Sequence, residues 1–123
     1  MSVLVDTDII IDFLRQSDNA VAFIGSLGPK PAVSVASVAE LYAGVKSRRE
    51  EALIEGILGA SRVLPLTTEI ARVAGQHLRH FGKSHGLDDL DALIAATAQH
   101  HDLEFATLNV KHFPMFKRLK AAY

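Results

Sequence analysis

The chain reads Val3-Leu4-Val5-Asp6-Thr7-Asp8 near its start, and this stretch indicates a strand that runs into a turn. Three consecutive apolar residues suit a strand that is covered on both faces, as strands of parallel sheets are. The residues from Ile9 to Leu14 then continue as a predicted helix. An acidic residue, Asp6, therefore stands directly at the carboxyl end of the first predicted strand.

The rest of the chain repeats this alternation of strand and helix. Further apolar strands are predicted over residues 32–35 and 103–108, and residues 63–66 are predicted as a short strand or extended link that Pro65 limits to a sheet edge. Helices are predicted over residues 9–14, 19–27, 37–45, 52–58, 67–84 and 90–101. This order predicts an α/β fold with a mostly parallel central sheet of four or five strands flanked by helices.

Size and composition limit the class of protein. A chain of 123 residues is expected to form one domain over residues 1–123. A hydrophobic content of 49% argues against disorder. The sequence has no cysteine, which excludes disulfides, thiol catalysis and cysteine zinc sites. With no signal peptide and no apolar run of about 18 residues, a soluble cytoplasmic protein without a membrane partner is expected.

The net charge of -1 conceals a segregation of charge along the chain. Residues 1–45 contain five acids and two bases, and residues 46–83 contain four acids and seven bases. Residues 84–110 contain five acids and no lysine or arginine, whereas residues 111–123 contain four bases and no acid. The acids thus gather in two separated windows, each next to a basic one.

Polar side chains follow three predicted strands at the point where each strand ends. Asp6 ends the first strand, Glu40 lies just after the second, and Asn109 follows the last. Asp91 lies in the first turn of the helix that precedes the last strand. In an open parallel sheet the functional crevice forms at the carboxyl ends of the strands, so these side chains are expected to meet there.

Such a group of carboxylates predicts a hard divalent cation. Carboxylates at short range repel one another unless a cation or a raised pKa relieves them. All-oxygen sites prefer Mg²⁺, with Mn²⁺ as the alternative ion. The chemistry expected of such a site is phosphoryl transfer, in which metal-activated water attacks phosphorus.

Each of these acids also has a structural interpretation. Asp6 could cap the helix after it, Ser37-x-x-Glu40 reads as a capping box, and Asp88-x-x-Asp91 as an acidic cap. Capping and metal ligation are compatible at one residue. Asp12 is predicted to be a solvated surface acid.

Four segments resemble the motifs of the PIN-domain family, and specifically its VapC toxins. The first runs from Val3 to Leu14 and includes Asp6, and the second runs from Ser34 to Gly44 and includes Glu40. The third, Leu90 to Ala98, includes Asp91 and is the most specific, and the fourth, Ala106 to Phe113, includes Asn109. The resemblance covers almost the whole chain, with the motifs in the family's order.

This resemblance implies a Mg²⁺-dependent ribonuclease toxin of a type II toxin-antitoxin module. Its metal ligands would be Asp6, Glu40 and Asp91, with Asn109 as a fourth catalytic residue and Thr7 and Asp8 as auxiliary residues. The implied partners are an RNA substrate and a VapB-like antitoxin, in a homodimer or a toxin-antitoxin hetero-oligomer. The family often carries an acid where Asn109 stands, and a final strand commonly follows.

Two surfaces are expected to serve these partners. An apolar groove for the antitoxin is predicted at Tyr42, Val45, Leu53 and Ile57, for which core packing is the alternative. The bases expected to hold RNA phosphates around the acidic centre are Lys46, Arg48, Arg49, Arg72, Arg79, Lys83, Lys111, Lys117, Arg118 and Lys120.

Other site chemistries stay open at this point. Asp6-Thr7-Asp8 also matches the DxD of a haloacid-dehalogenase-like phosphatase, although Ile9-Ile10 replaces the Gly-Thr expected there. A PIN-like domain that binds RNA or protein without cleaving is a third interpretation, supported by Asn109. A zinc site is disfavoured, since His77 and His80 lack the glutamate of an HExxH motif, and His77 is predicted to pack in the core.

Overall fold

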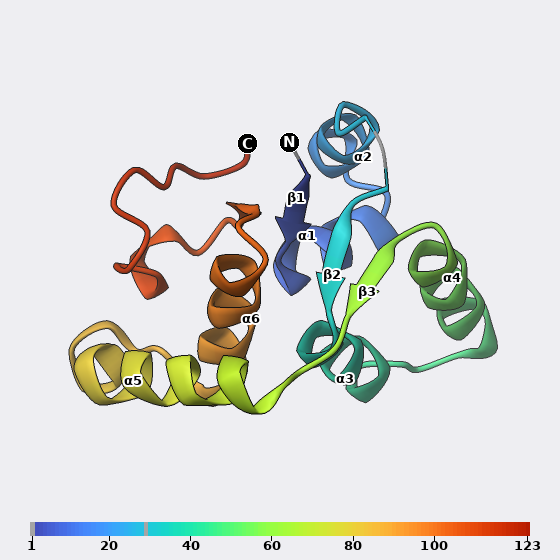
Figure 1. Cartoon of the computed structure of the whole chain (residues 1–123). Coiled ribbons are helices and arrows are strands. Elements are labelled where there is room, and N and C mark those ends of the chain that lie inside the picture. Colours follow the sequence, from blue (N-terminus) through green and yellow to red (C-terminus); the bar gives the residue numbers. More distant parts are fainter. Residues whose placement is uncertain (1, 29) are drawn as a thin grey trace.

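The computed structural model describes residues 2–28 and 30–123, which form a four-stranded parallel sheet with helices on both faces (Figure 1). The strand order is β3-β2-β1-β4, and every neighbouring pair is parallel. The strands are β1 (Val3–Val5), β2 (Ala32–Ser34), β3 (Arg62–Leu64) and β4 (Glu104–Ala106). The predicted fold class is confirmed, with four strands, and β3 lies at a sheet edge as Pro65 predicted.

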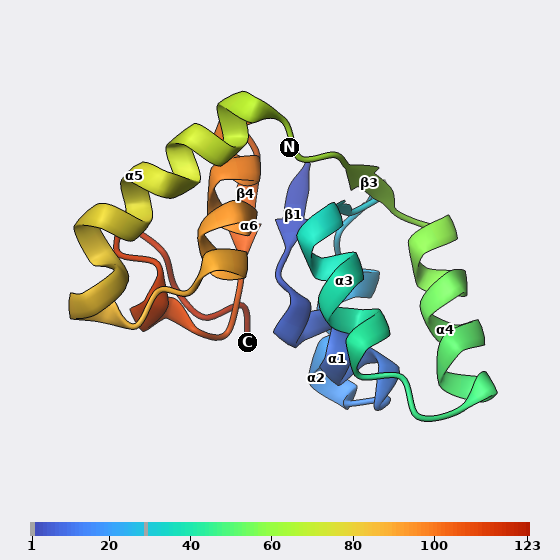
Figure 2. The same cartoon turned by 90° about the horizontal axis from the view of Figure 1, so that it is seen from below.

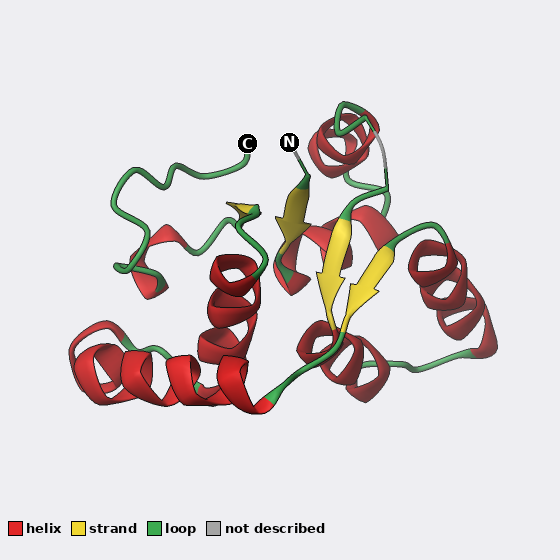
Figure 3. Ribbon diagram, in the orientation of Figure 1, coloured by secondary structure: helices red, strands yellow, loops and turns green. Residues whose placement is uncertain are grey.

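Helices connect all of these strands (Figure 3). A short 3₁₀ helix, η1, follows β4 and leads into an irregular segment that continues to Tyr123. The helices are α1 (Thr7–Leu14), α2 (Asp18–Gly25), α3 (Val35–Ala43), α4 (Arg48–Gly59), α5 (Thr68–His85), α6 (Asp89–His100) and η1 (Val110–His112). In the described part of the chain, no helix is both long and apolar enough to cross a bilayer.

Alternate residues of the short strands supply two separate cores. Leu4 of β1 belongs to a core with residues of α5 and α6, while its neighbour Val5 belongs to a core with residues of α1 and α4. The same alternation separates Phe105 from Ala106 in β4. Successive side chains of a strand point to opposite faces, so each apolar run covers both sides of the sheet.

The alanine-rich α6 lies close to both the sheet and α5. Ala92, Ala95 and Ala98 are fully buried, and α6 packs against α5, which it crosses at an angle (Figure 1). Small side chains let the α6 backbone approach its neighbours. This close packing fixes the first turn of α6, which carries Asp91.

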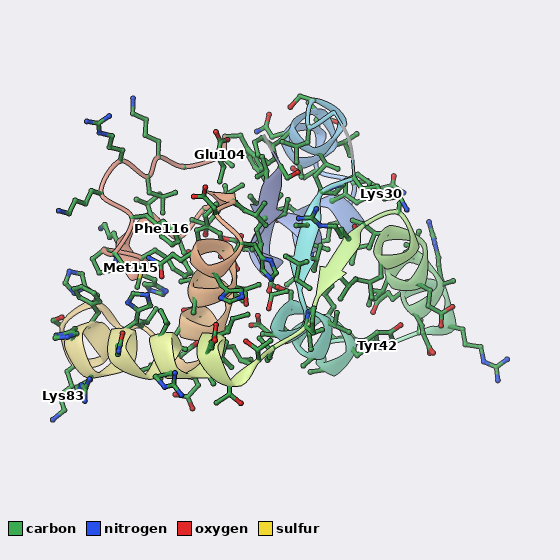
Figure 4. All side chains as sticks on the ribbon, viewed as in Figure 1. Lys30, Tyr42, Lys83, Glu104, Met115 and Phe116 are labelled. Carbon is green, nitrogen blue, oxygen red and sulfur yellow. The ribbon has the colours of Figure 1, made fainter. Side chains whose placement is uncertain are left out.

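After β4 the chain folds back over the α6 side of the sheet. The rings of Phe105 and Phe116 stack with centroids 5.1 Å apart, and Phe113 meets Phe105 edge to face at 4.8 Å. Met115 and Phe116 of this segment pack against the core to which the buried residues of α6 belong (Figure 4). These contacts hold the irregular segment, and residues 107–123 contain η1 and loops but no further strand.

Three helices start two or more residues before the predicted position, because polar caps begin them earlier. Helix α1 starts at Thr7, with Asp6 as its cap, so Thr7 and Asp8 lie in the helix. Helix α3 starts at Val35, because Ser34 caps it through the amide of Ala36, 3.1 Å away. The predicted capping box of Ser37 and Glu40 is therefore wrong, since both residues lie inside the helix.

Helix α4 starts four residues before the predicted position. Ser47 Oγ accepts a hydrogen bond from the amide of Glu50, and Glu50 Oε2 accepts one from the amide of Lys46, at 3.1 and 2.8 Å. This is a reciprocal arrangement close to a capping box. The charged stretch Lys46 to Glu51, predicted as a lead-in, thus contains the helix start.

Candidate functional site

The candidate site lies at the carboxyl ends of the central strands. Asp6 directly follows β1, and Thr107 directly follows the adjacent β4. Helix α3, which carries Glu40, begins where β2 ends, and Asp91 lies in the first turn of α6. Helices α3 and α6 lie on either side of β1 (Figure 2). The sheet topology therefore directs the predicted site residues to one edge.

Asp6 is held in place by hydrogen bonds at both carboxylate oxygens. Oδ1 accepts from the backbone amide of Thr7 at 2.8 Å, and Oδ2 accepts from the hydroxyl of Thr107 at 2.7 Å. Only 3% of Asp6 is exposed. Burial, followed by the nearby charge of Asp8, raises the pKa of Asp6 from 3.8 to about 7 despite the two donors. Asp6 thus caps α1, as one interpretation predicted, and is also a desolvated acid.

Asp8 faces the turn that follows β4. Its Oδ2 accepts from the amide of Leu108 at 3.0 Å, and its Oδ1 accepts from the amide of Ile9 at 2.8 Å. Burial raises the pKa of Asp8, while these amide donors oppose the rise. Thr107 Oγ1 lies 3.4 Å from Asp8 Oδ2, so this hydroxyl stands between Asp8 and Asp6.

Glu40 joins the site through Thr7. Thr7 Oγ1 lies 2.7 Å from Glu40 Oε1 and 2.8 Å from Ser37 Oγ. Because a carboxylate only accepts, the Thr7 hydroxyl donates to Glu40 and accepts from Ser37. Ser37 is fully buried and Thr7 nearly so, which fixes the position of this chain of hydroxyls. Thr7, predicted as an auxiliary residue, connects the first and second motifs.

Asp91 is partly buried and lies beside a histidine. Its Oδ2 is 3.5 Å from His112 Nδ1, and its backbone amide donates to Asp88 Oδ1 at 2.8 Å. Asp88 therefore caps α6, as predicted. Burial, then the charge of Asp88, raises the pKa of Asp91 to about 6, with a smaller rise from Glu40 and an opposing effect of His112.

The charges of these acids act on one another across the site. Asp6 is affected by Asp8 and Asp91, and Asp91 is affected by Glu40. The donor set consists of carboxylate oxygens in a desolvated setting, which is the chemistry that fits a hard divalent cation. Within residues 2–28 and 30–123, however, no three His, Asp or Glu side chains are arranged closely enough to hold one ion. Joint ligation by Asp6, Glu40 and Asp91 requires these side chains to approach one another.

Asn109 occupies an exposed position at the rim of the site. Its backbone amide donates to Thr107 Oγ1 at 3.0 Å, which helps to orient the hydroxyl that contacts Asp6. The structure therefore links Asn109 to the acids through its backbone and through Thr107.

Three residues of the site were not identified from the sequence: Ser37, Thr107 and His112. Ser37 and Thr107 are fully buried hydroxyls that contact Thr7 and Asp6, and His112 contacts Asp91. A small polar residue directly after a buried strand is the only sequence signal for Thr107. The sequence positions of Ser37 and His112 do not distinguish them from polar residues at the protein surface.

A groove of about 210 Å³ opens beside Glu40, between α1, α3 and α4. Its walls include Leu14 and Leu53, and the bases Arg15 and Lys46 line it as well. Of the four residues predicted for a partner groove, Leu53 lines this one, and Leu53 and Tyr42 are each 40% exposed. Figure 4 shows Tyr42 on α3. The other two residues, Val45 and Ile57, are partly buried and pack against the core.

One histidine of α5, His77, differs from the prediction. His77 is half-buried instead of packed in the core, and its Nε2 lies 2.6 Å from Oε1 of Gln99 on α6. The ring lies near the surface, where its Nε2 forms a hydrogen bond with the Gln99 side chain.

Comparisons with known proteins agree on one family. A family model described as PIN domain matches residues 3–120. Ribonuclease VapC10 of Mycobacterium tuberculosis is 45% identical over 127 residues, covering 98% of this chain and 92% of the relative. Ribonuclease VapC19 of the same organism is 40% identical over 124 residues, covering 98% of each. A chain of a toxin-antitoxin complex from Klebsiella pneumoniae matches with a TM-score of 0.85 and 28% identity, covering 99% of this chain and 98% of that chain.

Proposed function

The chain belongs to the PIN-domain family, and from this membership we propose that it is a Mg²⁺-dependent endoribonuclease that acts as the toxin of a VapBC-type pair in the cytoplasm. The relatives named as ribonucleases are similar along 98% of this chain, which supports an RNA-hydrolysing activity. The observation that carries the proposal is the gathering of Asp6, Glu40 and Asp91 at the carboxyl edge of the sheet, where burial raises the pKa of two of them.

The residues that would hold the ion are Asp6, Glu40 and Asp91. Mg²⁺ suits this set of oxygen donors, and Mn²⁺ is the alternative ion. When bound, the ion lowers the pKa of water and neutralises charge that develops on the scissile phosphate. A divalent charge also offsets the repulsion that Asp8 and Asp91 exert on Asp6.

The chain's own residues orient these ligands before any ion binds. The Thr107 hydroxyl and the Thr7 amide fix the two oxygens of Asp6, so the carboxylate has one rotational position. The Thr7 hydroxyl fixes one oxygen of Glu40 and leaves Oε2 available. These hydrogen bonds limit the rotamers of Asp6 and Glu40 and so reduce the conformational freedom that these two lose on binding, while joint ligation still requires the three side chains to approach one another. Asn109, at the exposed rim, is proposed to orient water or substrate by its side-chain amide.

The groove beside Glu40 supports the proposal of an antitoxin partner. It combines apolar walls with Arg15 and Lys46, and it opens next to a proposed metal ligand. A small VapB-like protein seated there would cover the acids and prevent entry of RNA. A homodimer or a toxin-antitoxin hetero-oligomer is the proposed assembly.

The phosphatase alternative is not retained. Both oxygens of Asp8 accept from backbone amides, those of Ile9 and Leu108. An acid that donates its proton to a leaving group needs an oxygen turned toward that group, and here both oxygens are already engaged by backbone amides. A PIN-like domain that binds RNA without cleaving it remains the second candidate, on the strength of Asn109.

Cleavage of RNA by purified protein with and without Mg²⁺ tests the proposal. Wild-type protein is expected to cut RNA only with Mg²⁺ or Mn²⁺, and Asp6→Asn is expected to lose at least about 100-fold in rate. Glu55→Gln, a change on the exposed face of α4, is the matched control and should keep full activity. Equal residual cleavage by wild type and Asp6→Asn would indicate a contaminating nuclease and favour the binding module.

The toxin assignment has a separate test. Expression of the chain alone should arrest growth, and co-expression of the neighbouring open reading frame should restore it. Unaffected growth, together with a neighbouring product that does not bind the chain, would overturn the toxin assignment even where nuclease activity is present.

A further inference from the structure

Two acids on one face of α1 accept hydrogen bonds from distant parts of the chain. Asp8 accepts from the amide of Leu108, and Asp12, one turn later, accepts from the hydroxyl of Tyr123 at 2.7 Å. Residues four apart on a helix lie on the same face. Asp12 is half-buried and bonded to Tyr123, so the prediction of a solvated surface acid is wrong.

Residues 122 and 123 connect this helix face to the turn after β4. The amide of Ala122 donates to the carbonyl oxygen of Thr107 at 3.1 Å. The next residue, Tyr123, reaches Asp12 with its hydroxyl, and its ring centroid lies 6.1 Å from that of Phe23 in α2. The carboxyl end of the described chain lies next to α1 (Figure 2). Ala122 and Tyr123 thus connect the turn after β4 to α1, and we call this contact region the junction.

This junction contains the donors on which the acidic site depends. Thr107 donates to Asp6, and Leu108 donates to Asp8, and the two carboxylates repel each other. A displacement of the turn by one hydrogen-bond length would leave both acids without these donors. The turn has no regular secondary structure to hold it, since residues 107–109 lie between β4 and η1.

We infer that Tyr123 is a positioning residue: its hydrogen bond to Asp12, together with the Ala122 amide on Thr107, holds the turn of residues 107–109 against α1 and so keeps Asp6 and Asp8 in place. The inference deepens the proposed function and rests on it for the consequence in catalysis. The claim that Tyr123 holds residues 107–109 in place does not depend on whether the protein is a nuclease. The contacts of Tyr123 are with Asp12 and Phe23, neither of which is a proposed metal ligand.

The first measurement is hydrogen exchange of the Leu108 and Asn109 amides in metal-free protein, followed by NMR. Tyr123→Phe keeps the ring and removes the hydroxyl. It should speed exchange of both amides about three- to tenfold, which is the change in rate expected from the loss of one hydrogen bond. Asp12→Ala should have the same effect, and the double variant should add nothing further. Asp12→Asn keeps an acceptor oxygen and should restore slow exchange.

The second measurement is the dissociation constant for Mn²⁺, followed by its electron paramagnetic resonance. Tyr123→Phe should weaken Mn²⁺ binding about three- to tenfold and lower kcat in proportion, with an unchanged number of sites per folded chain. A role in stability alone would lower the melting temperature or the number of sites and leave the dissociation constant unchanged. Ser84→Ala, which removes another exposed hydroxyl bonded to a neighbouring side chain, His85, should change neither quantity.

The outcomes separate this inference from the proposed function. Equal exchange rates, or equal Mn²⁺ dissociation constants, in wild type and Tyr123→Phe overturn the positioning role while the nuclease proposal stands. Wild-type protein that neither binds Mn²⁺ nor cuts RNA overturns the nuclease proposal and, with it, the catalytic consequence. In that case the exchange rates alone decide whether Tyr123 holds the turn.

Discussion

Asp6 serves both the fold and the candidate site. One oxygen caps α1, and the other accepts from Thr107 on the adjacent strand's end. Its burial is required for these contacts, and the same burial raises its pKa to about 7. A group this unfavourable when charged weakens the fold unless a proton or a cation accompanies it. The residue thus links stability to the ion that the site is proposed to bind.

This linkage predicts how the stability of metal-free protein depends on pH. The folded pKa of Asp6, about 7, lies above the ordinary 3.8, so between these values the folded state binds more protons than the unfolded state. Stability therefore falls as pH rises from about 4 to 7. Asp6→Asn should exceed wild type in unfolding free energy at pH 8 by on the order of 1–3 kcal/mol, with no excess near pH 4.

Denaturant unfolding in EDTA at pH 4, 5 and 8 measures this effect. Glu55→Gln serves as the control, since Glu55 is exposed on α4. A wild-type stability that rises from pH 5 to pH 8, or an Asp6→Asn variant less stable than wild type at pH 8, would contradict the argument.

At the scale of elements, short polar pairs decide where the helices begin. Ser47 and Glu50 start α4 inside a stretch that composition alone marks as charged and solvated. Ser34 starts α3 so that Ser37 and Glu40 both lie inside the helix, from which they reach Thr7. Helix starts thus set which side chains enter the site.

The cap of α4 can be tested against a matched serine. Ser47→Ala removes the acceptor for the Glu50 amide and should lower the unfolding free energy by about 1 kcal/mol. Ser17 occupies the same position at α2 but makes no side-chain cap bond, so Ser17→Ala should cost little. Thermal unfolding of both variants measures the difference. Equal losses would mean that the Ser47 hydroxyl does not stabilise α4.

At the scale of the whole molecule, the parallel sheet concentrates negative charge at one edge. Asp6, Glu40 and Asp91 come from three separate segments, and only their place at the carboxyl ends of strands brings them together. The bases lie mainly on α4, α5 and the segment after β4, and α4 and α5 carry acids as well, so the small net charge of -1 does not by itself reveal the acids at this edge. Such a charge distribution attracts a divalent cation to the edge.

Binding of this cation should stabilise the whole fold by mass action. Mg²⁺ at 100 times its dissociation constant should raise the unfolding free energy of wild type by about 2.7 kcal/mol at pH 8. Asp6→Asn should gain much less, because a proposed ligand is lost. Calorimetry with NaCl at matched ionic strength separates specific binding from screening. An equal gain for both proteins, or the same gain with NaCl, would argue against a site at Asp6.

The sequence supported most of the fold and part of the site. Alternating apolar runs predicted the parallel sheet, and Pro65 predicted that β3 lies at an edge. The placement of Asp6, Glu40 and Asp91 after strands or in a first helical turn predicted that they would share an edge. Helix starts were less accurate, because a cap depends on which of several serines, such as Ser34 or Ser37, turns its hydroxyl to the backbone.

By itself, the sequence determined the fold class, the family and the acids of the candidate site, because these depend on local periodicity and on short motifs. The tertiary structure alone decided which partners these acids have. Thr107 is 101 residues from Asp6, and Tyr123 is 111 residues from Asp12, so neither contact has a local signal. Such contacts form only when a parallel crossover brings β4 beside β1, and the resulting burial is what raises the pKa of Asp6.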